Sequence, residues 1–172
     1  MVRFKNRWLL IEFLPVNNQT TGKDGLEVDL STPSTQKQAH IEGKHIWGAI
    51  RQSVLSHFGD VGWGSVGLSL TVKYFSPTTH ICIVRVARDH HKIAWGAVTM
   101  LKSIEGVGIL PNVIHVSGPD LGTIKHAQLA AIEHNRVVVA RYRAQAGAPA
   151  AYQDSYVEYL RSSEDAINTL KD

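Results

Sequence analysis

The chain has 172 residues, 44% of them hydrophobic and 19% charged, and a formal net charge of +3 at pH 7. This length suits one domain, and the composition excludes an intrinsically disordered or a membrane-embedded chain, so no membrane partner is expected. The one cysteine, Cys82, excludes an internal disulfide and a cysteine-rich zinc site, and the N-terminal apolar run is too short for a signal sequence.

Charge is distributed unevenly along the chain. The stretch from Ala150 onward holds two basic and five acidic residues, which leaves 16 basic and 10 acidic residues before it. The chain thus combines a basic body with a small acidic tail. Such a body suits a polyanionic partner, with nucleic acid as the first candidate.

The first predicted elements are a strand, a loop and a helix. Residues 8–14 are apolar and aromatic and precede Pro15, which is typical of a buried strand. Small and polar residues then predict a long loop over about 15–37. Apolar residues recur at helical spacing over about 38–58, and Gly59 is expected to end this helix.

The middle of the chain predicts a β-hairpin and a second helix. Apolar and polar residues alternate over 66–74, which indicates a half-buried strand. The β-branched run over 80–87 is typical of a central strand that pairs with the previous one. Asp89 can then cap a helix over about 90–104, which the glycines of Gly106-Val-Gly are expected to end.

The last third predicts a strand and one or two helices. Residues 112–116 form a short predicted strand, and a helical pattern covers roughly 123–145. Within that pattern the run Val137–Val139 also fits a short strand, and periodicity does not decide between the two. Residues 148–172 are expected to be either a docked terminal helix or a partly ordered tail.

This order of elements predicts an α+β fold, with residues 1–147 as a single domain. A βαββαβ chain closes most simply as an antiparallel sheet with both helices on one face, the ferredoxin-like (RRM-like) sandwich, and an additional helix would cover an end or the other face. RNA-binding RRM domains stack bases on aromatic side chains of the central strands. Residues 80–87 offer no aromatic on either face, so the apolar sheet favours a covering helix or a protein partner over RNA.

No catalytic or metal-binding constellation is evident. The nine histidines lack ligand spacing, since His90 and His91 are adjacent and His40 and His45 lie five residues apart. Cys82 lies in an apolar run, which is typical of a buried, inert thiol. The carboxylates are scattered over strand ends, caps and helix faces: Glu12, Asp60, Asp89, Glu105, Asp120 and Glu133. Neither acid–base catalysis nor a protein-bound metal is therefore expected.

Three groups of mostly basic residues are candidates for contacts with RNA phosphates. In an extended arm, every second side chain points to the same side, so alternating basic residues can contact one phosphate backbone. At a helix N-terminus, free backbone N–H groups and a nearby cation can hold a phosphate. The candidate RNA-binding residues are Arg3, Lys5 and Arg7 in the arm, Arg85, Arg88 and Lys92 around the end of the central strand, and Thr123 and Lys125 at the start of the last long helix. The alternative for the arm is a frayed terminus with solubilising charges.

Several stretches of the chain resemble one known family. They are Met1-Val-Arg-Phe-Lys-Asn-Arg-Trp-Leu-Leu, Leu70-Thr-Val-Lys-Tyr-Phe-Ser, Ile83-Val-Arg-Val-Ala-Arg-Asp, and Val116-Ser-Gly followed by Gly122-Thr-Ile-Lys. In these motifs the chain is similar to the Pop-five family of protein subunits of ribonuclease P and ribonuclease MRP. It departs from the family pattern at Pro119-Asp-Leu, which separates the two halves of the last motif.

The resemblance implies a ferredoxin-like, noncatalytic protein that binds a catalytic RNA. That RNA removes 5′ leaders from precursor tRNA in ribonuclease P, and the MRP particle acts on pre-ribosomal RNA. The implied partners are the catalytic RNA, a barrel-fold protein subunit, other subunits of the particle and precursor tRNA nearby. Mg²⁺ is expected on the RNA, with no cofactor bound by the protein, and the implied location is the nucleus, within it the nucleolus.

Two other functional classes remain open. A small-ligand-binding or dimerising regulatory domain of ferredoxin-like fold would explain an apolar sheet equally well, although not the basic arm. An independent nuclease would need clustered histidines, which the spacing gives no reason to expect.

Overall fold

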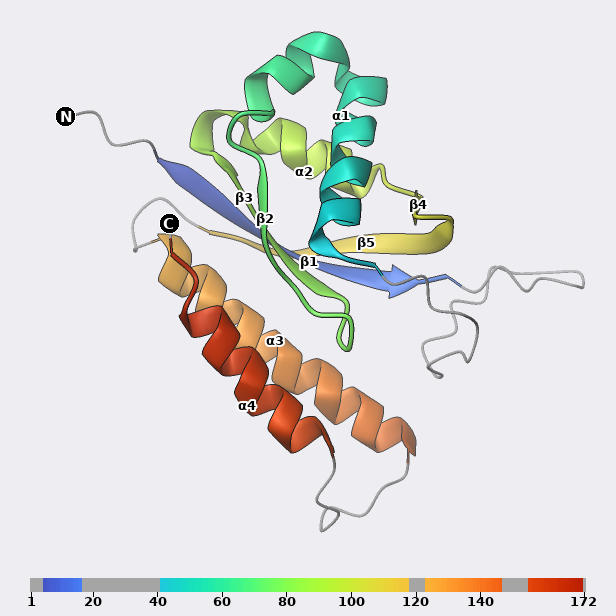
Figure 1. Ribbon diagram of the computed structural model, residues 1–172, viewed down its shortest axis with the longest axis vertical. Coiled ribbons are helices and arrows are strands. Elements are labelled where there is room, and N and C mark those ends of the chain that lie inside the picture. The colour runs from blue at the N-terminus through green and yellow to red at the C-terminus, as the bar shows by residue number, and fades with distance from the viewer. Residues whose placement is uncertain (1–4, 17–40, 118–122, 147–154, 172) are drawn as a thin grey trace, which may run out of the picture.

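The computed structural model describes residues 5–16, 41–117, 123–146 and 155–171. A short 3₁₀ turn precedes the second helix of this part of the chain. The elements, labelled in Figure 1, are β1 (Asn6–Pro15), α1 (Gly43–Val66), β2 (Thr71–Phe75), β3 (Ile81–Ala87), α2 (His91–Thr99), β4 (Ser103–Ile104), β5 (Val107–Val116), α3 (Thr123–Ala146) and α4 (Ser155–Asn168).

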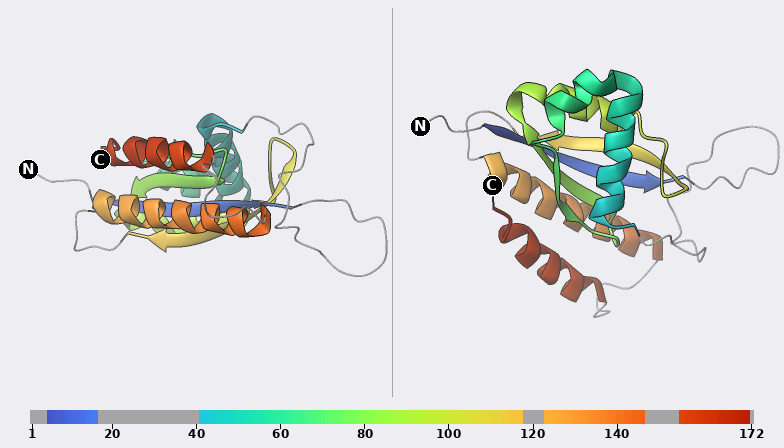
Figure 2. Two further views of the ribbon diagram at one scale, coloured as in Figure 1. Left: turned by 90° about the horizontal axis from the view of Figure 1, so that it is seen from below. Right: turned by 45° about the horizontal axis from the view of Figure 1, so that its top comes forward.

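The strands form one antiparallel sheet in the order β2-β3-β1-β5-β4. Helices α1 and α2 cover one face of this sheet, and α3 and α4 cover the other (Figures 1 and 2). The order of β2, β3, β1 and β5 is that of a ferredoxin-like sandwich, and β4 adds a short edge strand beside β5. The α+β, ferredoxin-like prediction is therefore confirmed.

The central strand β1 is buried on both faces. Leu9, Ile11 and Phe13 belong to the core beneath α1 and α2, whereas Trp8 and Leu10 belong to the core beneath α3 and α4. Successive side chains of a strand point to opposite faces, so a strand covered on both sides is a nearly continuous apolar run. This double burial explains why the first strand could be predicted from composition.

The helix predicted over about 38–58 is interrupted at Gly59 as expected, but a second helical segment that the sequence did not predict follows it within α1. Gly59 has φ 64° and ψ −168°, so it kinks α1, and the helix continues beyond it to the start of the predicted strand 66–74. Trp63, beyond the kink, packs edge-on against Trp47 with ring centroids 5.7 Å apart. This contact joins the two halves of α1. β2 is shorter than predicted because α1 extends to Val66 and a turn over 67–69 follows it before the strand begins at Thr71.

The predicted end of the second helix is a β-hairpin instead. α2 ends at Thr99 rather than near 104, and β4 and β5 follow as an antiparallel pair. Glu105 and Gly106 connect them with φ values of 50° and 78°, as in a type I′ turn. The glycine therefore marks a hairpin turn rather than a helix end, and β5 begins before the predicted strand 112–116.

The run Val137–Val139 lies inside helix α3, so the strand alternative is wrong. Val138 is buried in the core beneath α3 together with Ala127 and Ala131 of the same helix, at the spacing of one helical face. Tertiary burial of this face outweighs the β-propensity of three consecutive valines. α4 packs beside α3 and contributes the fully buried Ile167 to the same core.

A charged residue helps to fix α3 on the sheet. Glu12 of β1 is 5% exposed, and its Oε2 lies 3.1 Å from Nε2 of His134, while its Oε1 lies 3.6 Å from Nη1 of Arg141. Burial of the Glu12 carboxyl raises its pKa, but the hydrogen bond and charge of His134 and the charge of Arg141 outweigh burial, so that the pKa lies below its usual value.

The lowered pKa of Glu12 predicts acid sensitivity of the fold. Its ionised carboxylate stabilises the folded state above the unfolded pKa of about 4.3, and this contribution is lost as the pH falls through the lower folded-state pKa. Urea unfolding over a pH series is expected to show a shallower acid-side loss of stability in Glu12→Gln than in the unchanged chain. Glu133→Gln, an exposed position on α3, is the control and should leave the profile unchanged.

Candidate nucleic-acid interface

The antiparallel register brings three predicted basic groups to one end of the sheet. Asn6 at the start of β1 is paired with Ala87 at the end of β3, and Leu9 is paired with Val116 at the end of β5. α2 and α3 also begin at this end, next to the last residues of the strands that precede them (Figure 1). We call the described cations there the basic end: Lys5, Arg7, Arg85, Arg88, Lys92 and Lys125.

The side chains of two of the eight candidate residues are not described by the structure. Arg3 lies outside the described residues, and Thr123 is the first residue of α3, with its backbone alone described. The N-terminal arm is tied to the second basic group through the main chain, because the amide of Arg88 donates to the carbonyl oxygen of Lys5 at 2.9 Å. The arm and the end of β3 are thus neighbours in space.

Ser117 fastens the start of β1 to the end of β5. Its hydroxyl oxygen accepts a hydrogen bond from the amide of Trp8 at 2.9 Å, and its own amide donates to the Trp8 carbonyl at 2.9 Å. Nη1 of Arg7 donates to the Ser117 carbonyl oxygen at 3.0 Å. Ser117 is 1% exposed, so these bonds are shielded from water and hold the Arg7 side chain across the strand ends.

Replacement of Ser117 with alanine is expected to lower the free energy of unfolding by about 1–3 kcal/mol, because the buried amide of Trp8 loses its acceptor. Urea denaturation measures the loss, and faster hydrogen exchange at the Trp8 amide would place it at the basic end. The control is Ser65→Ala, since the Ser65 hydroxyl donates to the carbonyl oxygen of Val61 in its own, solvent-exposed helix turn. An equal loss in both variants would contradict the prediction.

The lysines of the basic end are free to contact a partner. Lys5, Lys92 and Lys125 are exposed, and none takes part in an ion pair among the described residues. Nε of Arg88 lies 3.1 Å from Oδ1 of Asp89, but both side chains are well exposed, and such pairs contribute little. The basic end therefore presents positive charge to solvent, as a surface for phosphates requires.

Two histidines at the basic end were not predicted as site residues. His115 of β5 and His126 of α3 lie ring to ring at 4.9 Å, and Nε2 of His115 is buried with no partner in the described part of the chain. Burial lowers the pKa of His115, and the nearby His126 lowers it further. The two histidines lack a local spacing that would reveal the pair, and the structure brings the rings together by placing the first turn of α3 beside the end of β5.

Lys73 is a further cation that the sequence did not single out. It extends from β2 with its Nζ 5.9 Å from the ring centroid of Trp8, and it donates to the carbonyl oxygen of Lys171 at 3.2 Å. Lys73 sits at a bulge between Val72 and Tyr74, where the register with β3 shifts. Alternation alone assigned it to a solvent-facing position, and the bulge was not visible in the sequence.

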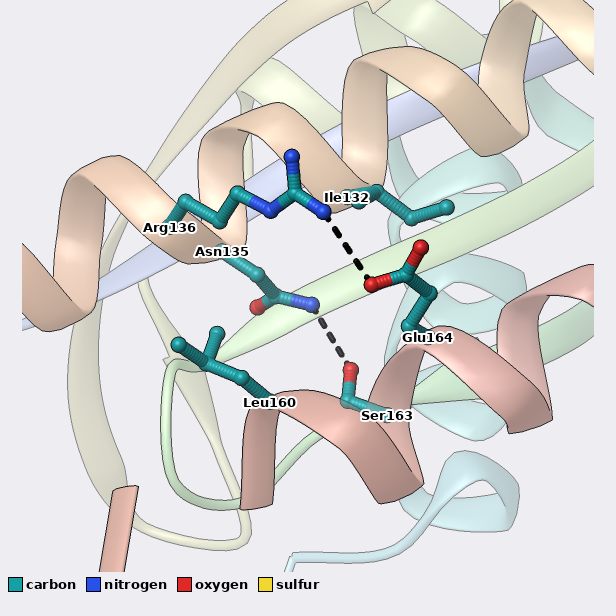
Figure 3. Close-up of a pocket in the computed structure, with 6 residues that line it drawn as sticks. All are labelled: Ile132, Asn135, Arg136, Leu160, Ser163 and Glu164. Atoms are coloured by element: carbon teal, nitrogen blue, oxygen red, sulfur yellow. Dashed lines mark hydrogen bonds and ion pairs between the residues drawn. The ribbon is translucent and has the colours of Figure 1, made fainter. Parts of the chain in front are cut away.

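Among the described residues these cations lie beside no metal cluster, although an open pocket of about 310 Å³ between the start of α1 and β2 is lined in part by Lys73. Within the described ranges, no group of three or more histidine, cysteine or acidic side chains could hold a metal ion. The cavity between α3 and α4, drawn in Figure 3, has a volume of about 10 Å³, which is the space of about one water.

Cys82 is fully buried, and burial raises the pKa of its thiol far above its usual value. No described helix is long and apolar enough to span a bilayer.

Exposed apolar side chains occur near the contact of α1 with α2 and at the C-terminal end of α2. Phe58, Trp95 and Met100 are 39%, 42% and 54% exposed. Phe58 packs on Gly96, where a Cβ atom would lie 2.9 Å from its Cζ, and Met100 follows Gly96 by one helical turn. We call these three side chains the apolar patch. Gathered exposed apolar side chains are typical of surfaces that contact another protein.

The chain is similar to several proteins of one family. The sequence profile of the Rpp14/Pop5 family matches residues 7–132, which include the whole sheet, α1, α2 and the first part of α3, but not α4. "Ribonuclease P/MRP protein subunit POP5" of Schizosaccharomyces pombe is 41% identical over 136 residues, which are 79% of this chain and 89% of that protein.

Two further relatives agree. "Probable ribonuclease P/MRP protein subunit POP5" of Arabidopsis thaliana is 37% identical over 69% of this chain and 71% of its own length. "Ribonuclease P/MRP protein subunit POP5" of Saccharomyces cerevisiae is 29% identical over 81% of this chain and 80% of its own length. The family resemblance of the motifs is thereby confirmed, and the chain belongs to the Rpp14/Pop5 family.

Proposed function

We propose that this protein is a noncatalytic, RNA-binding subunit of ribonuclease P and ribonuclease MRP particles. In these particles it supports the catalytic RNA in the removal of 5′ leaders from precursor tRNA and in the processing of pre-ribosomal RNA. The observation that carries the proposal is the gathering of six cations at one end of the sheet in a member of the Rpp14/Pop5 family. The names of the relatives, all subunits of ribonuclease P/MRP, support the same particle.

RNA binds this protein through phosphate contacts at the basic end and not through base stacking on the face of the sheet. The face that RRM domains use for base stacking lies beneath α3 and α4, with Trp8, Leu10 and Ile83 fully buried there. Exposed lysines at the strand ends instead suit contacts with the phosphate backbone, which fix position without reading sequence. Phosphate contacts of this kind suit an RNA that is recognised by the shape of its backbone rather than by its base sequence.

A protein subunit of the particle docks on the side of the molecule that α1 and α2 cover. The apolar patch includes Trp95, which lies one helical turn of α2 from Lys92 of the basic end, so the protein partner would border the RNA. Among the subunits of the particle, the barrel-fold subunit is the partner we assign to this patch. The covered sheet leaves no apolar sheet face for a dimer, which disfavours the alternative of a dimerising regulatory domain.

The metal ions of the reaction belong to the RNA. Attack on a phosphodiester needs Mg²⁺ near the attacking and leaving oxygens, and we assign these ions to the catalytic RNA. The protein then acts in the nucleus, in the nucleolus where pre-ribosomal RNA is processed, and contacts precursor tRNA only as a neighbour.

Purification of the tagged full chain from its native cell tests the proposal. The eluate is expected to contain one or two abundant structured RNAs and to cleave precursor tRNA at the 5′ leader, with the activity lost after digestion of the RNA. A protein that elutes without enriched RNA, alone or as a homodimer, would overturn the function. Cleavage that survives complete RNA digestion would overturn the noncatalytic role.

A further inference from the structure

Three hydrogen-bond donors lie together on the α3 and α4 face where the basic end begins. Trp8 of β1 and Arg85 of β3 are register partners. Arg85 continues the alternation of Ile81 and Ile83, which point to that face. Lys73 of β2 places its ammonium group 5.9 Å from the ring centroid of Trp8. Three adjacent strands thus bring an indole, a guanidinium and an ammonium group to one place.

Two of these donors are buried without an acceptor. Trp8 is 0% exposed, and its Nε1–H has no partner in the described part of the chain. Arg85 is partly buried, and its Nε likewise has none. A buried N–H without an acceptor is costly, and the cost is higher when the group is charged. Two neighbouring donors without partners form a site that is pre-organised for a hydrogen-bond acceptor supplied by a ligand.

The third donor has only a neutral acceptor. Lys73 donates to the carbonyl oxygen of Lys171, just beyond α4, and no described ion pair engages Lys73 or Arg85. Hydrogen bonds to an ionised acceptor are roughly twice as strong as those between neutral groups. An oxyanion would therefore displace the carbonyl from Lys73 and satisfy the other donors at the same time.

We propose that Lys73, Arg85 and Trp8 form a seat for one phosphate of an RNA backbone, the phosphate seat. Lys73 and Arg85 bind the phosphodiester oxygens, and the indole N–H of Trp8 donates to the same anion from beneath. The inference rests on the proposed RNA-binding function and extends its surface from the strand ends onto the flank of the sheet beside the end of α4.

Titration of the full chain with inorganic phosphate tests the seat directly, with the indole N–H resonances followed by NMR and sodium chloride used to match ionic strength. The Trp8 resonance is expected to shift progressively and to saturate. The Trp47 resonance is the internal control, because its Nε1 already donates to the carbonyl oxygen of Leu70 at 3.2 Å. A Trp8 resonance that stays in place, or moves only as much as that of Trp47, overturns the seat.

Three single variants separate the seat from the wider function. Lys73→Gln and Arg85→Gln are each expected to abolish the Trp8 response and to lower the slope of RNA affinity against salt by about 0.7–0.9, one phosphate contact. Lys92→Gln, at the basic end but outside the seat, should lower the slope equally and keep the Trp8 response. The Trp47 resonance reports that each variant is folded, and the RNA recovered with the tagged protein serves as ligand.

The outcomes of these variants are distinguishable. If only Lys92→Gln lowers the salt slope, the seat fails while RNA binding at the basic end stands. If none of the three variants lowers it, the proposed RNA contact at this end fails with the seat.

Discussion

Replacement of Asn135 with alanine is expected to lower the free energy of unfolding by about 2–3 kcal/mol and to loosen α4 from the rest of the fold. Asn135 of α3 is 2% exposed. Its Nδ2 donates to Oγ of Ser163 on α4 at 2.9 Å, and its Oδ1 accepts from Oγ1 of Thr79 at 2.7 Å and from the Tyr159 hydroxyl at 3.3 Å. The amide therefore joins α3, α4 and the β2–β3 connection.

Asn135→Ala is expected to cost this much stability because its lost hydrogen bonds are buried. Thr79 and Ser163 are 1% and 5% exposed, so water does not readily replace the lost amide. Part of the loss is recovered, because the Tyr159 hydroxyl still lies 2.9 Å from Thr79 Oγ1 and the Tyr74 hydroxyl 2.8 Å from Ser163 Oγ. Urea denaturation measures the loss in stability, and hydrogen exchange is expected to speed up most in α4.

The neighbouring residue supplies a matched control on the same interface. Nη2 of Arg136 lies 3.1 Å from Oε2 of Glu164, and Figure 3 shows this pair beside the bond from Asn135 to Ser163. The two charged side chains are 59% and 42% exposed, so Arg136→Ala is expected to cost less than about 1 kcal/mol. Similar losses in the two variants would mean that the buried network is not what holds α4.

The fold was predictable where local pattern and burial agree. β1 and β3 are covered on both faces and are nearly continuous apolar runs, so their place at the centre of the sheet could be read from composition. Some corrections concern contacts that lie outside a local window, whereas the hairpin of β4 and β5 is local and its turn glycine was interpreted as a helix end. Gly59 interrupts the first helix as its propensity predicts, but the second helical segment of α1, which packs Trp63 on Trp47, was not predicted. Three valines in α3 favour a strand locally, yet the core needs their helical face.

The site was predictable as a set of residue types and not as a surface. The sequence indicates three separate basic groups, and only the register of β1 with β3 and β5 makes the ends of these strands neighbours. The residues that sequence reasoning missed have their partners far away in the chain. His115 meets His126 across the start of α3, and Lys73 reaches Trp8 from a bulge in β2. No local pattern contains such pairs.

Reversal of the three exposed lysines of the basic end is expected to weaken RNA binding by about 10²–10³-fold at 0.1 M salt. Lys5, Lys92 and Lys125 come from β1's arm, α2 and α3, and each faces solvent without an ion pair among the described residues. Each lost phosphate contact lowers the slope of log affinity against log salt by about 0.7–0.9. Affinities converge near 1 M salt, so about two to three units of slope give this loss at 0.1 M.

A second triple variant with the same change in net charge distinguishes a binding surface from a general charge effect. Lys44, Lys102 and Arg161 are exposed, and they lie on α1, between α2 and β4, and on α4, outside the basic end. Among the described residues Lys44 forms an ion pair with Glu42 at 2.7 Å, and both side chains are largely in solvent, so reversal of Lys44 leaves the core intact. Filter binding over a salt series should give a reduced slope for the first triple variant and the unchanged slope for the second. Equal losses in both would mean that RNA responds to total charge, and the basic end would then have no special role.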